Sequence, residues 1–254
     1  MRRFLIDQIP PGDDNVTIRG AEAKHIVKVL RMKPQDHIIV ADTKGSRYQG
    51  VIISASPSSV HVRLIRPLPN PQSPWLHLTL CQALLKSRAM DLVVQKATEL
   101  GVARIVPFTS ERTVVRLSGE RLHNKLRHWQ EIARSATAQS DRDKPPEISP
   151  LVGFDQVLEM GRAYVGLRII LWEEERSNDI KSILGASGKT KKTMAVVGPE
   201  GGFSEAEVER ATKAGFVPAT LGGRILRAET AAIVICTLCL YEWGDLGVQR
   251  VHGP

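Results

Sequence analysis

The sequence predicts an α/β protein of two domains, a small β-barrel followed by a layered α/β domain. Short segments rich in β-branched residues occupy the chain before residue 67. A connector with four prolines follows at residues 67–74, and its missing backbone donors favour an extended chain. Beyond the connector, strand-like and helix-like segments alternate, which is typical of βαβ units around a mainly parallel sheet.

The first domain, residues 1–70, contains four predicted strands and one predicted helix. The strands are residues 16–19, 36–41, 47–53 and 59–65. The helix spans residues 21–31 and has an apolar face of Ile26, Val27 and Leu30 and a basic face of Lys24, Lys28 and Arg31. Four short strands with one helix indicate a small barrel.

The second domain, residues 75–244, alternates between the two kinds of element. Strands are predicted at residues 75–81, 103–107, 164–172 and 193–197, and helices at 90–100, at 119–138, from Ser204 and from Ala228. The last ten residues, 245–254, are polar and contain glycine, and we expect a flexible tail there.

Composition excludes several classes of protein. No apolar run approaches the ~20 residues of a membrane span, and the basic start at Met1 lacks the apolar stretch of a secretion signal, so we expect a cytoplasmic protein. Three cysteines are too few for a disulfide framework. Cys236 and Cys239 form a C-x-x-C inside an apolar, helix-like segment, which favours buried thiols over a redox or zinc site. The histidines show no metal-ligand spacing, and we expect no metal.

The charge favours an anionic partner. The formal net charge is +8 and the pI is near 9.6. Residues 1–74 carry 11 Lys and Arg against 6 Asp and Glu, so most of the excess lies on the small barrel. Nucleic acid fits this distribution slightly better than a merely solubilising surface does, but charge alone does not decide between them.

A glycine-rich turn follows the predicted strand that ends near Gly198. It runs to Ser204, where Ser204 and Glu207 form a capping box that starts a helix. Glycines at the carboxyl end of a strand let a ligand approach the backbone. The spacing matches neither common phosphate-binding loop. The turn therefore predicts a small ligand that is not held mainly by phosphates, with a purely structural turn as the alternative.

A second such segment spans residues 221–231. Gly222 and Gly223 form a tight turn, and polar side chains including Arg227 and Glu229 stand at the entrance of an apolar helix. An Arg–Glu pair there could be a structural cap. Two glycine-rich loops after neighbouring strands are better explained as opposite walls of one pocket.

These two segments resemble the signature pair of the SPOUT (trefoil-knot) RNA methyltransferases, and within them the enzymes that methylate N3 of a uridine in 16S ribosomal RNA. Residues 2–4, 22–31, 90–101 and 110–116 are also similar to that family, so the resemblance covers nearly the whole chain. Two positions depart from the pattern: Ala138 stands where the family has Glu, and Gly223 where Pro or Arg is expected. The first argues against an essential role for that acidic residue, and the second suggests a more flexible cofactor loop.

The resemblance implies a PUA-like barrel that binds RNA, a SPOUT α/β knot domain, a homodimer, and S-adenosylmethionine as cofactor. Arg227 would stabilise the uridine anion, and Glu229 would act as a base or orient Arg227. The expected cofactor-binding residues are Leu171, Gly198, Pro199, Glu200, Gly201, Leu221, Gly222, Arg224, Ile225, Leu226, Thr230 and Ala231. The expected phosphate contacts are Arg2, Arg3, Lys28, Arg31, Lys86, Arg88 and Lys96.

Three other functions remain open from the sequence. One is a non-catalytic RNA-binding protein, although both glycine-rich segments are intact. Another is a nucleotide-dependent metabolic enzyme of doubly wound topology, although neither phosphate-loop fingerprint is present. The third is a trefoil-knot methyltransferase that acts on transfer RNA or large-subunit ribosomal RNA. The substrate would be either ribosomal RNA or the assembled small ribosomal subunit.

Overall fold

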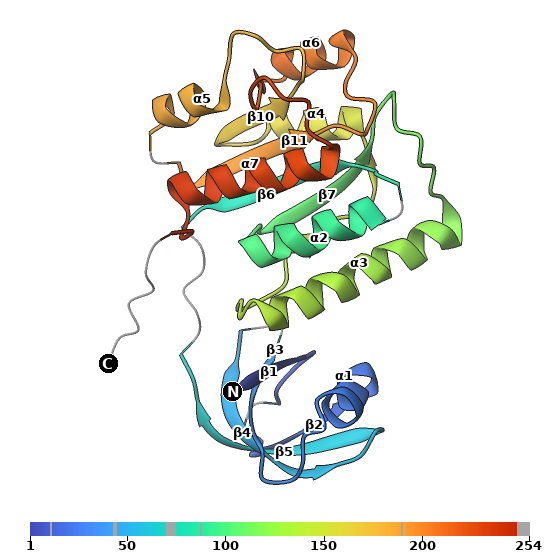
Figure 1. Cartoon of the computed structure of the whole chain (residues 1–254), viewed down its shortest axis with the longest axis vertical. Coiled ribbons are helices and arrows are strands. Elements are labelled where there is room, and N and C mark those ends of the chain that lie inside the picture. The colour runs from blue at the N-terminus through green and yellow to red at the C-terminus, as the bar shows by residue number, and fades with distance from the viewer. Residues whose placement is uncertain (11, 43–44, 70–74, 87, 189, 248–254) are drawn as a thin grey trace. The chain divides into compact units, whose positions relative to one another are not determined.

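The computed structural model describes residues 1–10, 12–42, 45–69, 75–86, 88–188 and 190–247 (Figure 1). The chain divides into two compact units. The N-terminal unit comprises Met1–Ser73 together with Arg134–Pro145, and the C-terminal unit comprises Pro74–Ala133 together with Pro146–Pro254. The long helix α3 (Gly119–Gln139) therefore contributes residues to both units.

The N-terminal unit is built on a five-stranded sheet in the order β1-β3-β4-β5-β2. The strands are β1 (Arg2–Ile6), β2 (Asn15–Arg19), β3 (His37–Asp42), β4 (Arg47–Ala55) and β5 (Ser59–Pro67). β1 pairs with β3 in parallel and the other pairs are antiparallel. Alternation along β5 buries Val60 and Val62 in the core of this unit and leaves His61 and Arg63 exposed.

The helix of this unit changes its winding part of the way along. α1 (Gly20–Lys24) continues into a π-helix, η1 (His25–Val29), where the Leu30 amide donates to the His25 carbonyl at 3.0 Å. The expected faces are confirmed, since Ile26 is buried while Lys24 and Lys28 are exposed. The expected continuous α-helix over residues 21–31 is wrong from His25 onward, and Arg31 has the left-handed φ of 53°. Short π-helical segments occur frequently at functional sites.

The C-terminal unit contains a parallel seven-stranded sheet in the order β12-β10-β11-β6-β7-β8, with β9 also paired to β7. The strands are β6 (His77–Ala83), β7 (Arg104–Thr109), β8 (Glu147–Ile148), β9 (Val152–Gly153), β10 (Leu167–Leu171), β11 (Lys192–Val197) and β12 (Val217–Ala219). The helices besides α3 are α2 (Arg88–Leu100), α4 (Phe154–Arg162), α5 (Ile180–Ala186), α6 (Glu205–Lys213) and α7 (Ala228–Trp243).

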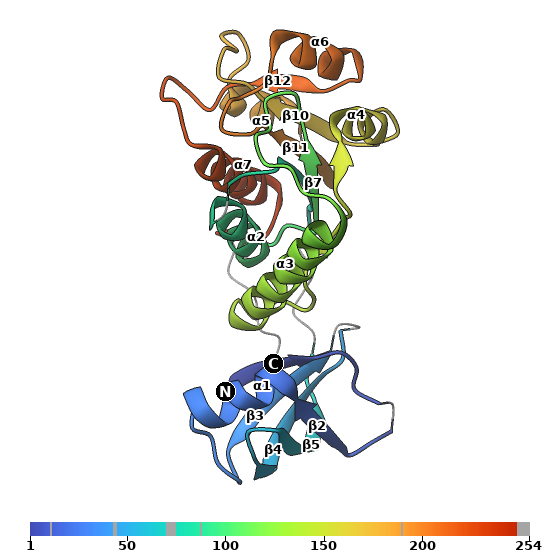
Figure 2. The same cartoon turned by 90° about the vertical axis from the view of Figure 1, so that its right-hand side faces the viewer.

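Alternate residues of the buried strands enter two different cores, one on each face of this sheet. Ala195 and Val197 belong to the core formed with α2, α3, α5 and α7, whereas Met194 and Val196 belong to the core formed with α4 and α6. Figure 2 shows α2 and α7 on one side of the strands and α4 on the other. A strand covered on both faces reads as a continuous apolar run, as residues 193–197 do.

The predicted architecture, a small β unit followed by an α/β domain with a parallel sheet, is confirmed. Several elements were not predicted: β1, the short strands β8, β9 and β12, and the helices α4 and α5. Each is short or has a mixed sequence, and the strands among them are positioned by pairing with residues far along the chain. β1, for example, pairs with β3 through the register Phe4–Val40.

The three cysteines are buried and free. Burial raises the pKa of the Cys81 and Cys239 thiols to about 12, and it raises the pKa of Cys236 well above its ordinary value, with Cys239 adding to the shift. The thiols of Cys236 and Cys239 therefore remain protonated at neutral pH, and the prediction of buried thiols is confirmed. Within the described residues, no helix is long and apolar enough to cross a membrane.

The structure predicts opposite effects for two glycine-to-alanine changes in helices of the C-terminal unit. A Cβ at Gly161 in α4 would overlap the Phe216 ring in the α4–α6 core, whereas a Cβ at Gly185 in α5 would meet no atom within 4 Å. We expect Gly161→Ala to lower the free energy of unfolding by about 1–3 kcal/mol through overpacking. Gly185→Ala should raise it by about 0.5 kcal/mol, since alanine restricts the unfolded chain. Urea denaturation of both variants measures the difference, and equal effects would contradict the packing around Phe216.

Candidate functional site

The candidate site is defined by the carboxyl ends of three adjacent parallel strands. β10 pairs with β11 on one side and with β12 on the other, and Leu171 lies opposite Ala219. The two glycine-rich segments follow β11 and β12, so they do not leave neighbouring strands as the sequence suggested. β10 lies between them and contributes its own end at Leu171. Open parallel sheets bind ligands at this kind of edge.

The first glycine-rich loop is fastened to the core at both ends. The buried Gln82 side chain donates from Nε2 to the Gly198 carbonyl at 3.2 Å. Phe203 is 2% exposed and stacks on Phe108, with ring centroids 6.3 Å apart. Between these anchors, the Gly202 amide donates to the Pro199 carbonyl and closes the turn.

The glycines of this loop are surrounded by protein side chains. A Cβ at Gly198 would lie 3.1 Å from the Phe203 ring, and a Cβ at Gly201 would lie 3.2 Å from the Cβ of Arg112. Gly202 has a φ of +68°, and a Cβ there would overlap the Glu173 carboxylate. Side chains of the protein itself therefore approach all three glycines closely.

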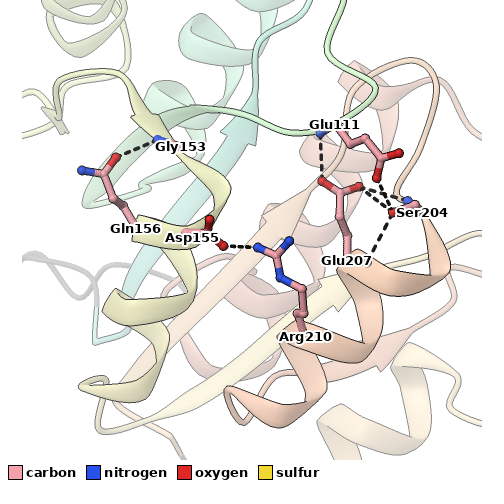
Figure 3. A network of polar contacts seen from close by, with 7 residues as sticks. All are labelled: Glu111, Gly153, Asp155, Gln156, Ser204, Glu207 and Arg210. Carbon is pink, nitrogen blue, oxygen red and sulfur yellow. Dashed lines mark hydrogen bonds and ion pairs between the residues drawn. The ribbon is translucent and has the colours of Figure 1, made fainter.

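The capping box predicted at the start of α6 is confirmed and extends to a further segment (Figure 3). The Ser204 amide donates to Glu207 Oε2 at 3.0 Å, and the Glu207 amide donates to Ser204 Oγ at 3.3 Å. Glu207 Oε1 also accepts from the Glu111 amide at 2.9 Å, and Ser204 Oγ donates to Glu111 Oε2 at 2.8 Å. Glu207 is 3% exposed, so its charge is held by these bonds.

The second glycine-rich loop is more open than the first. Gly222 has a φ of +108°, and a Cβ at Gly222 or Gly223 would meet no atom within 4 Å. Ile225 is 91% exposed, which is unusual for an apolar side chain of its size. Leu221 and Leu226 are half-buried, and Arg224 is exposed.

Arg227 is the N-cap residue of α7, and its side chain makes no capping hydrogen bond. It is exposed, while Glu229 in the first turn of the helix is half-buried. In the part of the chain that the structure describes, no ion pair joins Arg227 to Glu229. The structure therefore does not support the alternative in which Arg227 and Glu229 form a structural cap of α7. Thr230 is exposed and Ala231 half-buried on the same turn.

The remaining cofactor candidates lie in or next to the first loop. Leu171 is 8% exposed with its side chain in the core, so only its backbone is available to a ligand. Pro199 is buried, and Glu200 and Gly201 are exposed. Glu200 Oε1 accepts from the Lys86 amide at 2.9 Å, which attaches the segment after β6 to this loop.

The basic residues of the N-terminal unit fall into two groups. Arg2, Lys28 and Arg31 are exposed. Arg3 is not, because its side chain is only 4% exposed. Its guanidinium lies 3.6 Å from the Asp141 carboxylate and donates to the Asp143 carbonyl. Burial lowers the pKa of Arg3, and the charge of Asp141 opposes that shift. Arg3 is therefore a buried partner of Asp141, unlike the three exposed candidates, and its contact with an RNA phosphate stays a prediction.

The basic candidates of the C-terminal unit also differ from one another. Lys86 and Arg88 are exposed. Lys96 forms an ion pair with Glu99 at 2.8 Å, so its charge is already balanced. The described residues contain no group of three or more His, Cys, Asp or Glu that could hold a metal ion. A cleft lined by Trp172, Val208, Pro218 and neighbouring residues of α6 includes none of the predicted site residues.

Sequence reasoning missed Gln82, Glu111 and Arg112. Arg112 donates from NH1 to the Gly201 carbonyl at 3.1 Å, so it contacts the first loop directly. Their segments carry no glycine-rich or charged motif that identifies them. The one signal in the sequence was the family resemblance of residues 110–116.

Two domain families match most of the chain. The RNA methyltransferase domain family matches residues 71–240, and the RNA methyltransferase PUA domain family matches residues 18–65. A relative from Mesomycoplasma hyopneumoniae (strain 232), named ribosomal RNA small subunit methyltransferase E, is 32% identical over 244 residues, or 95% of this chain and 100% of the relative. The Bacillus subtilis (strain 168) protein of the same name is 31% identical over 89% of this chain and 90% of its own.

Two solved structures are similar over nearly their full length. The ribosomal RNA small subunit methyltransferase E of Neisseria gonorrhoeae, bound to S-adenosyl methionine, has a TM-score of 0.85 at 32% identity and covers 96% of this chain and 99% of its own. A Legionella pneumophila protein solved with bound SAM has a TM-score of 0.88 at 29% identity, with coverage of 96% and 98%. Both domain matches and the whole-length identity agree. This chain belongs to the ribosomal RNA small subunit methyltransferase E family of RNA methyltransferases.

Proposed function

We propose that this protein transfers a methyl group from S-adenosylmethionine to N3 of a uridine in 16S ribosomal RNA. The observation that carries the proposal is the convergence of Leu171 and both glycine-rich loops at the ends of β10, β11 and β12, in a chain of this family. The uridine and its N3 atom follow from the family resemblance of the two signature segments. We further propose that the protein acts in the cytoplasm as a homodimer.

The second loop supports binding of the cofactor. The open space at Gly222 and Gly223 gives a ligand access to the backbone, and the exposed Ile225 can cover an apolar ring. Backbone groups at Leu171, Gly198 and Leu226 would then hold adenine, ribose and the methionine part. The cofactor supplies a methyl group on a sulfonium, so the bond from methyl to sulfur breaks as the bond to the base nitrogen forms. The protein has to fix the two reactants in line.

Arg227 is suited to stabilise the uridine when it has lost its N3 proton. A uridine N3 must lose its proton before it is a good nucleophile, and the negative charge then spreads to the base carbonyls. Arg227 brings a cation to the start of α7, where the unpaired backbone N–H groups and the helix dipole also favour negative charge. Glu229 stands two residues away and is a candidate to take the proton. Glu229 has the chemistry for either of two roles, to take this proton or to orient Arg227.

The exposed cations of the N-terminal unit support RNA binding. Arg2, Lys28 and Arg31 carry no acidic partner among the described ion pairs. Lys and Arg at such a surface bind phosphates and release counterions, whatever the sequence of the RNA. A uridine inside structured RNA would also have to turn outward to reach the loops.

Methylation of separate RNA substrates tests the proposal. We would incubate the protein with radiolabelled S-adenosylmethionine and small subunits, large subunits or transfer RNA from an unmodified source. We expect label in small-subunit RNA alone, as N3-methyluridine identified by mass spectrometry of the digested nucleosides. Label in transfer RNA or large-subunit RNA would overturn the proposed substrate. It would favour the alternative of a trefoil-knot methyltransferase that acts on one of those RNAs.

Replacement of Arg227 should separate catalysis from cofactor binding. We expect Arg227→Ala to lower kcat by about 100-fold or more, since a charge-stabilising contact made in the transition state is lost. The dissociation constant for S-adenosylmethionine, measured by calorimetry, should stay within about twofold of wild type. A large loss of cofactor affinity would instead make Arg227 a cofactor ligand.

Reversal of two charges tests the N-terminal unit as the RNA-binding surface. We expect Lys28→Glu combined with Arg31→Glu to weaken RNA binding by about tenfold or more at low salt and to reduce the slope of log affinity against log salt by about two. The control is Arg162→Glu combined with Lys191→Glu, which makes the same change of charge at exposed residues of the C-terminal unit. Equal loss in both double variants would point to net charge alone.

A further inference from the structure

The segment after β7, residues 110–116, has no role in the mechanism above. It begins with a tight turn, in which the Thr113 amide donates to the Ser110 carbonyl at 3.1 Å. The Ser110 amide donates in turn to Thr113 Oγ1 at 2.9 Å. Glu111 and Arg112 lie at the tip of the turn, and both are exposed.

Hydrogen bonds join the tip of this turn to the residues where the first glycine-rich loop becomes α6 (Figure 3). The Glu111 amide donates to the buried Glu207 carboxylate, and the Glu111 carboxylate accepts from Ser204. Hydrogen bonds to a charged group are about twice as strong as neutral ones. The backbone that carries Arg112 is therefore fixed against the loop that would hold the cofactor.

The Arg112 side chain continues along that loop. Its NH1 donates to the Gly201 carbonyl at 3.1 Å, and its Cβ and Cδ lie 3.2 and 3.7 Å from the position of a Cβ at Gly201. A guanidinium has five N–H donors, and this contact uses one of them. Within the residues that the structure describes, Arg112 takes part in no ion pair.

Other exposed cations border the same loop. Lys86 is attached through its amide to Glu200, the residue before Gly201, and Arg88 is two residues further along the chain. The segments after β6 and β7 thus bring Lys86 and Arg112 to the same turn, one through its backbone and one through its guanidinium.

We propose that Arg112 binds a phosphate of the RNA next to the target nucleotide while it holds Gly201. An exposed guanidinium with free donors in fixed geometry suits a phosphate, which it can contact through two N–H groups. The inference rests on the proposed function, because it places the RNA backbone at the loop that binds the cofactor. Arg112 would thereby set the distance between the RNA chain and the methyl group.

The test compares Arg112→Ala with Arg116→Ala, which removes an exposed arginine of the same segment that has no contact with the glycine-rich loop among the described bonds. We would measure binding of unmodified 16S ribosomal RNA, binding of S-adenosylmethionine, and KM and kcat for methylation. For Arg112→Ala we expect RNA binding weaker by about tenfold and a raised KM for RNA. Cofactor affinity should stay within about twofold, and the salt slope should fall by about one. Arg116→Ala should resemble wild type.

A conservative variant distinguishes a phosphate contact from a structural role. Arg112→Lys keeps the charge and should recover part of the RNA affinity, which a purely structural role would not predict. Weaker cofactor binding with unchanged RNA binding would show that Arg112 serves the loop or the cofactor carboxylate, and it would overturn the inference. Unchanged values for both ligands would overturn it as well. RNA binding is measured without methylation, so failure of wild type to methylate would count against the proposed function and leave the test of Arg112 intact.

Discussion

The carboxylate of Glu207 joins three parts of the candidate site that are distant in the sequence. It accepts from the backbone at Ser204, where the first glycine-rich loop becomes α6, and from the backbone at Glu111, in the segment after β7. A buried charge without partners would cost several kcal/mol, so the fold tolerates Glu207 only while both segments donate to it. Loss of either donor would therefore disturb the other. The loop, the helix start and the turn that carries Arg112 form one rigid assembly for this reason.

The parallel sheet also fixes the position of the first glycine-rich loop. β11 is covered on both faces and paired along both edges, by β6 and by β10, so the position of Gly198 at its end is strongly determined. The second loop follows the three-residue strand β12 and is more exposed, up to Ile225. The site thus combines a buried wall with an exposed one. Such a division suits a reaction that needs in-line geometry as well as entry and exit of a cofactor.

Local patterns in the sequence were sufficient for much of the fold but not for the assembly of the site. The Ser204–Glu207 capping box, the buried apolar strands and the two buried cysteines of α7 depend on neighbours in sequence, and all were predicted correctly. β1 and the burial of Arg3 depend on partners far along the chain, namely β3 and Asp141. The order of strands has the same origin, since no local pattern shows that β10 lies between β11 and β12. The family resemblance supplied the cofactor and the substrate, which periodicity alone did not.

The glycines of the two loops lie in different environments, and they should therefore change differently in evolution. Gly202 is required by its φ of +68° and by the Glu173 carboxylate, and Gly198 and Gly201 lie tightly against Phe203 and Arg112, whereas Gly222 and Gly223 face open space. A descendant that lost its enzymatic activity would still favour glycine at the first three positions, because side chains of the same chain pack against them. Gly222 would also be favoured by its φ of +108°, and Gly223 is the position that would be free to change once no ligand used that space. Retention of the first loop in a distant homologue is therefore evidence of the same fold and not by itself of a working enzyme.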